Sequence, residues 1–137
     1  MLTTINKSGI QKPQYADIML RRFCRKANIV PESVRLILGK RKDHLKYPGG
    51  RYKGDKETVV VRINRYTLYE DFEFVLAHEI GHLKQHRESG KEFRTLERRE
   101  QYATKFAMGT CGCNPVTEYS GTSRYAKKKL SRDNYGI

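Results

Sequence analysis

The sequence predicts a single α+β domain built from an N-terminal helix, a small three-stranded twisted sheet and two packed helices. Three observations lead to this expectation. Apolar residues recur at helical spacing in three segments, β-branched residues dominate positions 58–64, and the pairs Gly49-Gly50 and Gly54-Asp55 are turn signals. With 137 residues the chain has room for one hydrophobic core, so residues 1–137 are expected to form one domain.

The N-terminal part is predicted to contribute the first helix and the first strand. Residues 1–13 are expected to be irregular as far as Pro13. The spacing of apolar residues predicts a helix over residues 14–28, with core contacts from Ile18, Met19, Phe23 and Ala27. Pro31-Glu32-Ser33 then separates this helix from a strand over residues 34–38.

The middle of the chain is predicted to supply two more strands and the longest helix. Residues 51–53 lie between the Gly turns, and Val59-Val60-Val61 suit a mostly buried strand over residues 58–64. Thr67 and Glu70 have the spacing of a capping box, which would start the next helix. The buried stripe of this helix is predicted to contain Phe72, Val75, Leu76, Ile80 and Leu83.

A second capping box, Ser89-Gly90-Lys91-Glu92, predicts a last helix that runs to about Met108 and stops at Gly109. One face of this helix would carry Leu96, Glu100, Ala103 and Ala107, and the small Ala residues would allow close packing on the preceding helix. The tail, residues 110–137, is basic and rich in Gly, Ser and Thr, and we expect it to be at most partly ordered.

The stretch His78-Glu79-Ile80-Gly81-His82 has the HExxH spacing of a zinc site. Residues at positions i and i+4 of a helix share one face, so His78 and His82 can bind one ion. Glu79 follows the first ligand, where its carboxylate can act as a general base on the attacking water. Gly81 costs about 1 kcal/mol relative to Ala inside a helix, which suggests that another backbone passes close to this turn.

A catalytic zinc site needs a third protein ligand and keeps its fourth position open. His86 lies two turns beyond His78, about 12 Å along the helix axis, so one ion is not expected to bind both. Glu100 is the preferred candidate, because a carboxylate on the inner face of the last helix requires a partner. Glu97 and Glu88 remain alternatives.

The segment from Phe74 to Met108 resembles the ImmA/IrrE group of zinc metallopeptidases. In that group HExxH is followed by a helix with the motif E-x-x-A-[ND]-x-F-A, which is matched by Glu100, Ala103, Phe106 and Ala107. The resemblance implies a minimal zincin-like fold, Glu100 as the third ligand (a gluzincin arrangement) and an edge strand at residues 58–64 for substrate pairing. Thr104 departs from the motif, so a hydroxyl would have to orient a ligand in place of Asn or Asp.

A weaker resemblance is to SprT-like proteases, which act on proteins attached to DNA. Those proteins combine a strand with I-x-L-N, the HExxH motif and a segment HG-x-x-F. The corresponding residues here are Ile63-Asn64 and Ser89-Gly90-Lys91-Glu92-Phe93. Ser89 stands where the third His of that family would be, and a serine hydroxyl is a poor zinc ligand.

The net charge of +13 is concentrated outside the centre of the chain. Residues 1–54 hold thirteen basic and three acidic residues, whereas residues 55–100 hold nine and ten. Basic flanks of this kind can bind nucleic acid, hold an acidic protein or aid solubility. The candidate nucleic-acid contacts are Arg21, Arg22, Arg25, Lys26, Lys40, Arg41, Lys42, Lys127, Lys128 and Lys129.

Composition also predicts the compartment. No stretch approaches 18 apolar residues and the N-terminus has no hydrophobic signal core, so we expect neither a membrane span nor an export signal. An odd count of three Cys suits a reducing cytoplasm, with Cys111-Gly112-Cys113 as reduced thiols.

The favoured function is a zinc-dependent endopeptidase that acts on a protein substrate, which the resemblance implies to be a regulatory or DNA-associated protein. Glu79 would take a proton from water and deliver it to the leaving amine, while His78, His82 and Glu100 hold Zn²⁺. The candidates for stabilising the oxyanion are Tyr102, Tyr119 and Tyr125. The alternatives are a SprT-like DNA-associated protease and a non-catalytic zinc-containing module that binds nucleic acid or protein.

Overall fold

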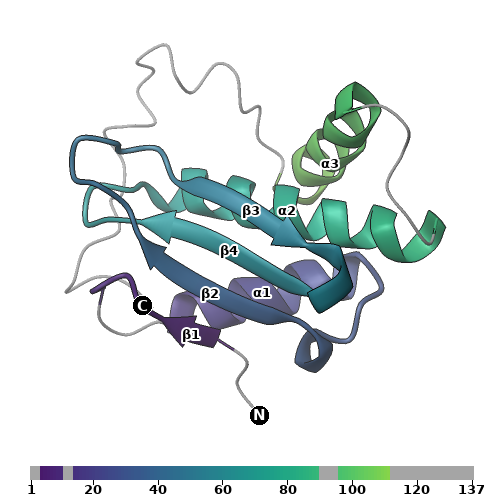
Figure 1. Ribbon diagram of the computed structural model, residues 1–137, viewed down its shortest axis with the longest axis horizontal. Coiled ribbons are helices and arrows are strands. Elements are labelled where there is room, and N and C mark those ends of the chain that lie inside the picture. The colour runs from purple at the N-terminus through teal and green to yellow at the C-terminus, as the bar shows by residue number, and fades with distance from the viewer. Residues whose placement is uncertain (1–3, 11–13, 90–95, 112–137) are drawn as a thin grey trace.

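A four-stranded sheet carries two helices on one face, and a third helix packs on the second of these (Figure 1). The computed structural model describes residues 4–10, 14–89 and 96–111. The strands are β1 (Thr4–Asn6), β2 (Arg35–Lys40), β3 (Gly49–Lys53) and β4 (Thr58–Ile63). The helices are α1 (Gln14–Lys26), α2 (Tyr69–Ser89) and α3 (Leu96–Cys111), with 3₁₀ turns η1 (Pro31–Ser33) and η2 (Gly54–Lys56).

The sheet has the order β1-β2-β4-β3, with β3 at one edge. β2 is parallel to both β1 and β4, whereas β3 runs antiparallel to β4. The core lies between this sheet and the two helices. Its strand residues are fully buried and alternate along β2 and β4: Leu36, Leu38, Val59, Val61 and Ile63. The prediction of an α+β domain is therefore confirmed.

The predicted sheet of three strands is wrong by one strand, because Thr4–Asn6 pairs in parallel with β2. This β1 strand lies in the segment that we expected to be irregular. Three residues are too few to show a periodic pattern, and only their partners on β2 define them as a strand. The implied edge position of residues 58–64 is also wrong, since β4 is central and the glycine-containing β3 forms the edge.

Helix α1 is close to its predicted bounds but ends at Lys26, before Asn28, whose φ of 61° is left-handed. Met19, Phe23 and Ala27 are buried as predicted. Ile18 was expected in the core but is 51% exposed, because the buried stripe of the helix runs through Met19 and Leu20 instead.

Helix α2 buries its whole predicted stripe, from Phe72 to Leu83. The predicted capping box at its start is not formed as expected. The Thr67 hydroxyl accepts the backbone N–H of Asn64 at 3.0 Å, so it stabilises the turn before the helix. The Asn64 side-chain amide in turn donates to the carbonyls of Lys42 and Leu45, which ties the loop that leads to β3 to the start of α2.

Helix α3 extends past the predicted stop, since Gly109 lies inside it and the helix ends at Cys111. A Cβ on Gly109 would meet nothing within 4 Å, so a side chain at this position would find open space among the described residues. Ser89 is the last residue of α2, and the remainder of the predicted second capping box lies outside the described residues. The predicted tail also lies outside them, apart from residues 110 and 111.

Two further expectations concern membranes and thiols. None of the helices in the described ranges combines the length and apolar character needed to cross a bilayer. Cys24 and Cys111 are free thiols, and Cys113 lies outside the described residues. Burial raises the pKa of the Cys24 thiol to about 12, so this thiol stays protonated at neutral pH.

Candidate metal centre

The side chains of His78, His82 and Glu100 converge between α2 and α3. Nε2 of His78 lies 3.0 Å from Oε1 of Glu100, and Nε2 of His82 lies 3.0 Å from Oε2. The nearest ligand atoms of the three residues all lie within 4.8 Å of one another. Around a tetrahedral ion with bonds of about 2.0 Å, ligand atoms stand about 3.3 Å apart, so this set fits a single metal ion after small side-chain rotations.

Helix α2 sets the two imidazoles on one side of the helix, four residues apart, with ring centroids 4.8 Å from each other. Helix α3 brings Glu100 to them because the two helices approach very closely. A Cβ on Gly81 would lie only 3.0 Å from Cα and 3.2 Å from the carbonyl oxygen of Ala103. Ala103 and Ala107 are both fully buried. The expectation that a second backbone passes close to Gly81 is confirmed, and that backbone belongs to α3.

The imidazoles are themselves held by neighbouring side chains. The Thr104 hydroxyl lies 3.4 Å from Nδ1 of His78, so the hydroxyl that replaces the Asn or Asp of the motif reaches one of the two candidate ligand histidines. The ring of Tyr52, from β3, stacks on His82 with centroids 4.6 Å apart and an interplanar angle of 6°. These contacts restrict the orientation of both rings before any ion binds.

Electrostatics at the site follow from burial. Burial lowers the pKa of His78, against the opposing effect of the Glu100 carboxylate, and so favours the neutral imidazole that a metal requires. Burial also raises the pKa of Glu79 to about 8, and the charge of Glu100 adds to this shift. The metal-free site therefore contains one carboxyl group, Glu79, that holds its proton at neutral pH.

The edge strand β3 runs along the Glu79 side of α2. A Cβ on Gly50 would lie 2.6 Å from Oε2 of Glu79 and 2.6 Å from Cγ1 of Val75. The sequence pattern places Gly50 in a turn and indicates no role for Tyr52, so neither contact with the site can be predicted from it. The strand predicted over residues 51–53 is confirmed as part of β3, but the sequence contains no signal that places this strand beside Glu79.

The other candidates for the third ligand lie elsewhere. The ring of His86 stands against Gly54 in η2, because a Cβ on that glycine would lie 2.7 Å from the imidazole. The Glu88 carboxylate is bound by Lys84 and by the hydroxyl of Tyr102. The side chain of Glu97 lies outside the described residues. Glu100 is thus the carboxylate that the described structure places at the two histidines.

Of the three tyrosines proposed to stabilise an oxyanion, only Tyr102 lies within the described residues. Its hydroxyl donates to Oε1 of Glu88 at 2.8 Å, and burial together with this bond raises the pKa of Tyr102 to about 12. Glu88 follows His82 by six residues, about 9 Å along α2. The structure therefore directs the Tyr102 hydroxyl to the carboxyl end of α2 instead of the three converging side chains.

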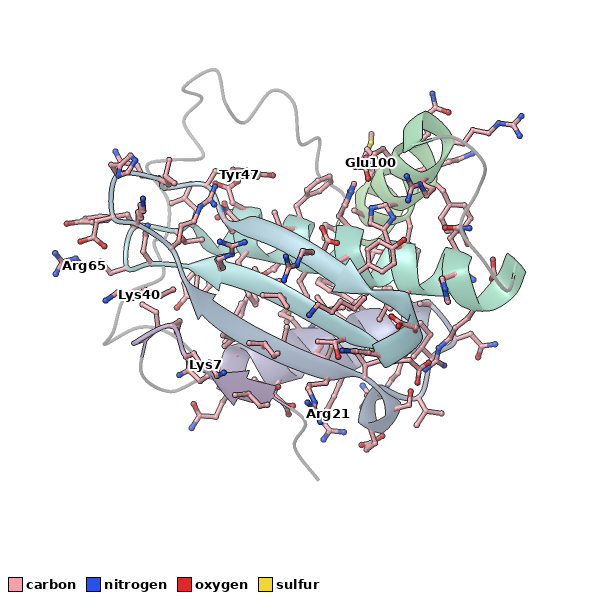
Figure 2. The ribbon with its side chains drawn as sticks, in the orientation of Figure 1. Lys7, Arg21, Lys40, Tyr47, Arg65 and Glu100 are labelled. Carbon is pink, nitrogen blue, oxygen red and sulfur yellow. The ribbon has the colours of Figure 1, made fainter. Side chains whose placement is uncertain are left out.

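Those predicted nucleic-acid contacts that the structure describes lie on more than one part of the molecule. Arg21 is paired with Asp17 and Glu32, whereas Arg22, Arg25 and Lys26 are exposed along α1. Figure 2 shows Lys40 and Arg21 at well separated places on the molecule, and neither lies near Glu100. Lys42 is exposed and Arg41 is half-buried in the loop after β2, and Lys127, Lys128 and Lys129 lie outside the described residues.

Comparison with known families agrees with the geometry. The family model described as the IrrE N-terminal-like domain, a peptidase family, matches residues 38–111. This range contains β3, β4, α2 and α3, and therefore every residue of the site described above. No curated protein and no solved structure matches the chain. Because the matched range covers more than half of the chain, the protein belongs to the IrrE N-terminal-like peptidase family, as its resemblance to ImmA/IrrE proteins predicts.

Proposed function

We propose that the protein is a zinc-dependent metalloendopeptidase. The observation that carries this proposal is the convergence of His78, His82 and Glu100 with the Glu79 carboxyl group beside them. Two imidazoles and one carboxylate are the ligand set of known hydrolytic zinc sites, in which a fourth position stays open. Zn²⁺ at this position would supply a Lewis acid that activates water near neutral pH and polarises a peptide carbonyl.

Glu79 is the proposed general base and acid. It lies one residue from the ligand His78 on the same helix, and it is 7% exposed. A divalent ion bound beside Glu79 would favour its ionised form, so the carboxylate could accept a proton from the attacking water and later deliver it to the leaving amine. Tyr52 holds the ring of His82, and Thr104 holds the ring of His78, while these proton transfers take place.

The outer edge of β3, with which no described strand pairs, is the proposed place for the substrate backbone. A strand at the edge of a sheet presents a row of N–H and C=O groups to which an extended peptide can pair. Gly50 and Tyr52 bring this strand against Glu79 and His82. A peptide that adds to β3 would therefore pass alongside the residues that carry the chemistry. We infer that the substrate is a protein segment bound in an extended conformation.

The proposal is tested first by cleavage. The zinc-loaded wild-type protein should cleave unfolded proteins, whereas Glu79→Gln should bind zinc equally well and lose at least about 1000-fold in rate. Zinc content measured by atomic absorption separates loss of metal from loss of chemistry. Retained cleavage in Glu79→Gln would remove this residue from the reaction, and zinc binding without any cleavage would favour a structural role for the ion.

The ligand set is tested by stoichiometry. Glu100→Ala should lower zinc content well below one ion per chain, whereas Glu88→Ala and Glu97→Ala should leave it unchanged. We further propose that the natural substrate is a regulatory or DNA-associated protein of the cytoplasm, as the family resemblance implies. DNA-stimulated cleavage by the wild-type protein would favour the SprT-like alternative within this proposal.

A further inference from the structure

The edge strand β3 presents two sides with very different side chains. Gly50 and Tyr52 face α2 and the metal centre. Arg51 and Lys53 alternate with them, so they point to the opposite face of the sheet, and both are exposed. We call this face, which none of the described helices covers, the open face. Neither Arg51 nor Lys53 forms an ion pair with any residue in the described ranges.

A third cation continues this row at Gly49. This glycine pairs with the exposed Arg62 of β4, so its missing side chain would also point to the open face. The Arg41 guanidinium fills that place, since a Cβ on Gly49 would lie 2.8 Å from Nη1 of Arg41. Nε of Arg41 donates to the carbonyl of Tyr47 at 3.2 Å, which holds the group there. Positions 49, 51 and 53, which follow one another about 7 Å apart along the strand, thus each present a positive charge.

Within the described ranges, few acidic groups lie close to this row of positive charges. Glu57 is paired with Arg87, and Asp55 lies beyond the end of β3 in η2. Arg62 on the adjacent strand β4 and Arg35 on β2, one strand further away, add exposed positive charge to the open face. Figure 2 shows nitrogen-tipped side chains lying over β3 and β4 on the side turned to the viewer. The open-face side of the β3 edge is therefore strongly positive, whereas the side toward the metal centre is not.

We propose that this row selects substrates, so that the peptide bound along β3 carries Asp or Glu at every second position. The inference rests on the proposed function, because it concerns the same bound strand. Side chains directly opposite each other on adjacent strands stand about 5 Å apart, and opposite charges at such pairs attract. Alternate residues of the substrate lie beside Arg51, Lys53 and the Arg41 guanidinium. The residues between them face the metal centre.

The test uses four peptides of equal length, labelled with fluorescein, and the zinc-loaded full-length protein. Three peptides carry Glu, Gln or Lys at every second position, with Ala and Leu at the remaining positions. The fourth has the composition of the Glu peptide but places its Glu residues in adjacent pairs, so only half of them can lie on one side of a strand. Cleavage by the wild-type protein gives kcat/KM, and fluorescence anisotropy with Glu79→Gln gives affinity without turnover.

The alternating Glu peptide should have a kcat/KM and an affinity about tenfold higher than those of the Gln peptide. Both values should also be about threefold higher than those of the paired Glu peptide. In the double variant Arg51→Glu, Lys53→Glu this preference should reverse toward the Lys peptide. The matched control is Arg22→Glu, Lys26→Glu on α1, which changes the net charge equally and should retain the preference for Glu. Melting temperatures check that both double variants are folded.

Equal rates for the Glu and Gln peptides would overturn the inference while leaving the proposed function intact. Equal rates for the alternating and paired Glu peptides would also overturn it, because net charge alone would then explain the attraction. The inference would also be overturned if the double variant Arg51→Glu, Lys53→Glu kept its peptide preference and lost only its binding to a single-stranded or duplex oligonucleotide. The open face would then be a nucleic-acid binding surface. A further outcome is that no peptide is cleaved, while the wild-type protein prefers the Glu peptide in binding and the β3 double variant prefers the Lys peptide. That result would contradict the proposed peptidase function but support selective binding of acidic peptides along β3.

Discussion

The main chain of Gly50 runs directly against the Glu79 carboxyl group, because a Cβ at this glycine would lie 2.6 Å from Oε2. Any side chain larger than the hydrogen of Gly50 would therefore have to displace either β3 or the Glu79 carboxyl group. The finding links a strand that binds substrate in our proposal to the residue that moves the proton, and it makes Gly50 a sensitive probe of both.

Gly50→Ala should lower the cleavage rate about 100-fold without loss of zinc, because the new methyl group must displace Glu79 or push β3 outward. Gly39→Ala is the matched control in β2, since its methyl group would meet only the flexible Arg62 side chain on the open face. Rates and zinc content of the two variants check the prediction. Equal activity in both would show that Glu79 tolerates displacement.

Gly81→Ala should weaken zinc binding about tenfold, because the methyl group meets backbone atoms of Ala103 and shifts α3 together with Glu100. Gly109→Ala is the control, since it is also inside a helix but its Cβ would meet nothing within 4 Å. It should stabilise the protein by up to about 1 kcal/mol through helix propensity. Competition with a chelator measures zinc affinity, and unchanged affinity in Gly81→Ala would contradict the tight helix packing described above.

Thr104→Val should weaken zinc binding about tenfold, because it removes the hydroxyl 3.4 Å from Nδ1 of His78 while keeping the shape of the side chain. Thr104→Asn introduces the residue that the related motif carries and should restore affinity. Both variants are compared by chelator competition. Wild-type affinity in Thr104→Val would show that His78 needs no support from this position.

The metal-free protein should lose stability as pH rises from 5 to 8. The pKa of Glu79 is about 8 in the folded protein and 4.5 for an unperturbed Glu, so the unfolded chain releases this proton first. Below about pH 4 both states are protonated and no stability is lost. At pH 8 the loss is on the order of 4 kcal/mol, and it is complete only above that pH. Thermal unfolding in a chelator measures this change for the wild type and for Glu79→Gln.

The neutral side chain of Glu79→Gln has no proton to release, so this variant should be less sensitive to pH over the same range. Because all other titrating groups are shared, the difference between the two unfolding curves isolates Glu79. Parallel curves for the two proteins would show that Glu79 titrates at an ordinary pKa.

Local patterns were sufficient to predict the helices and the three converging side chains. The stripe from Phe72 to Leu83 and the close approach at Gly81 follow from helical periodicity and from the cost of glycine in a helix. Helix ends were less predictable. Gly109 has the residue type of a helix stop, yet α3 continues through it to Cys111.

The arrangement of the sheet could not be predicted, because strand order depends on pairing between distant segments. β1 has only three residues and is defined by its partners Leu36, Ile37 and Leu38 on β2. The position of β3 beside Glu79 is likewise determined by pairing with a distant segment, in this case β4. Nothing local in Gly49-Gly50 distinguishes a turn from the start of an edge strand, so the contact with the site emerged only from the fold.

The attachment of α3 has a consequence for how the domain opens. Among the described elements this helix packs mainly on α2, through the small residues Gly81, Ala103 and Ala107. An ion bound by His78, His82 and Glu100 would crosslink the two helices, so detachment of α3 would require release of the metal. Amide hydrogen exchange in α3 should therefore slow strongly on zinc binding while exchange in β2 and β4 changes little, which would make this helix the part of the fold that reports metal occupancy.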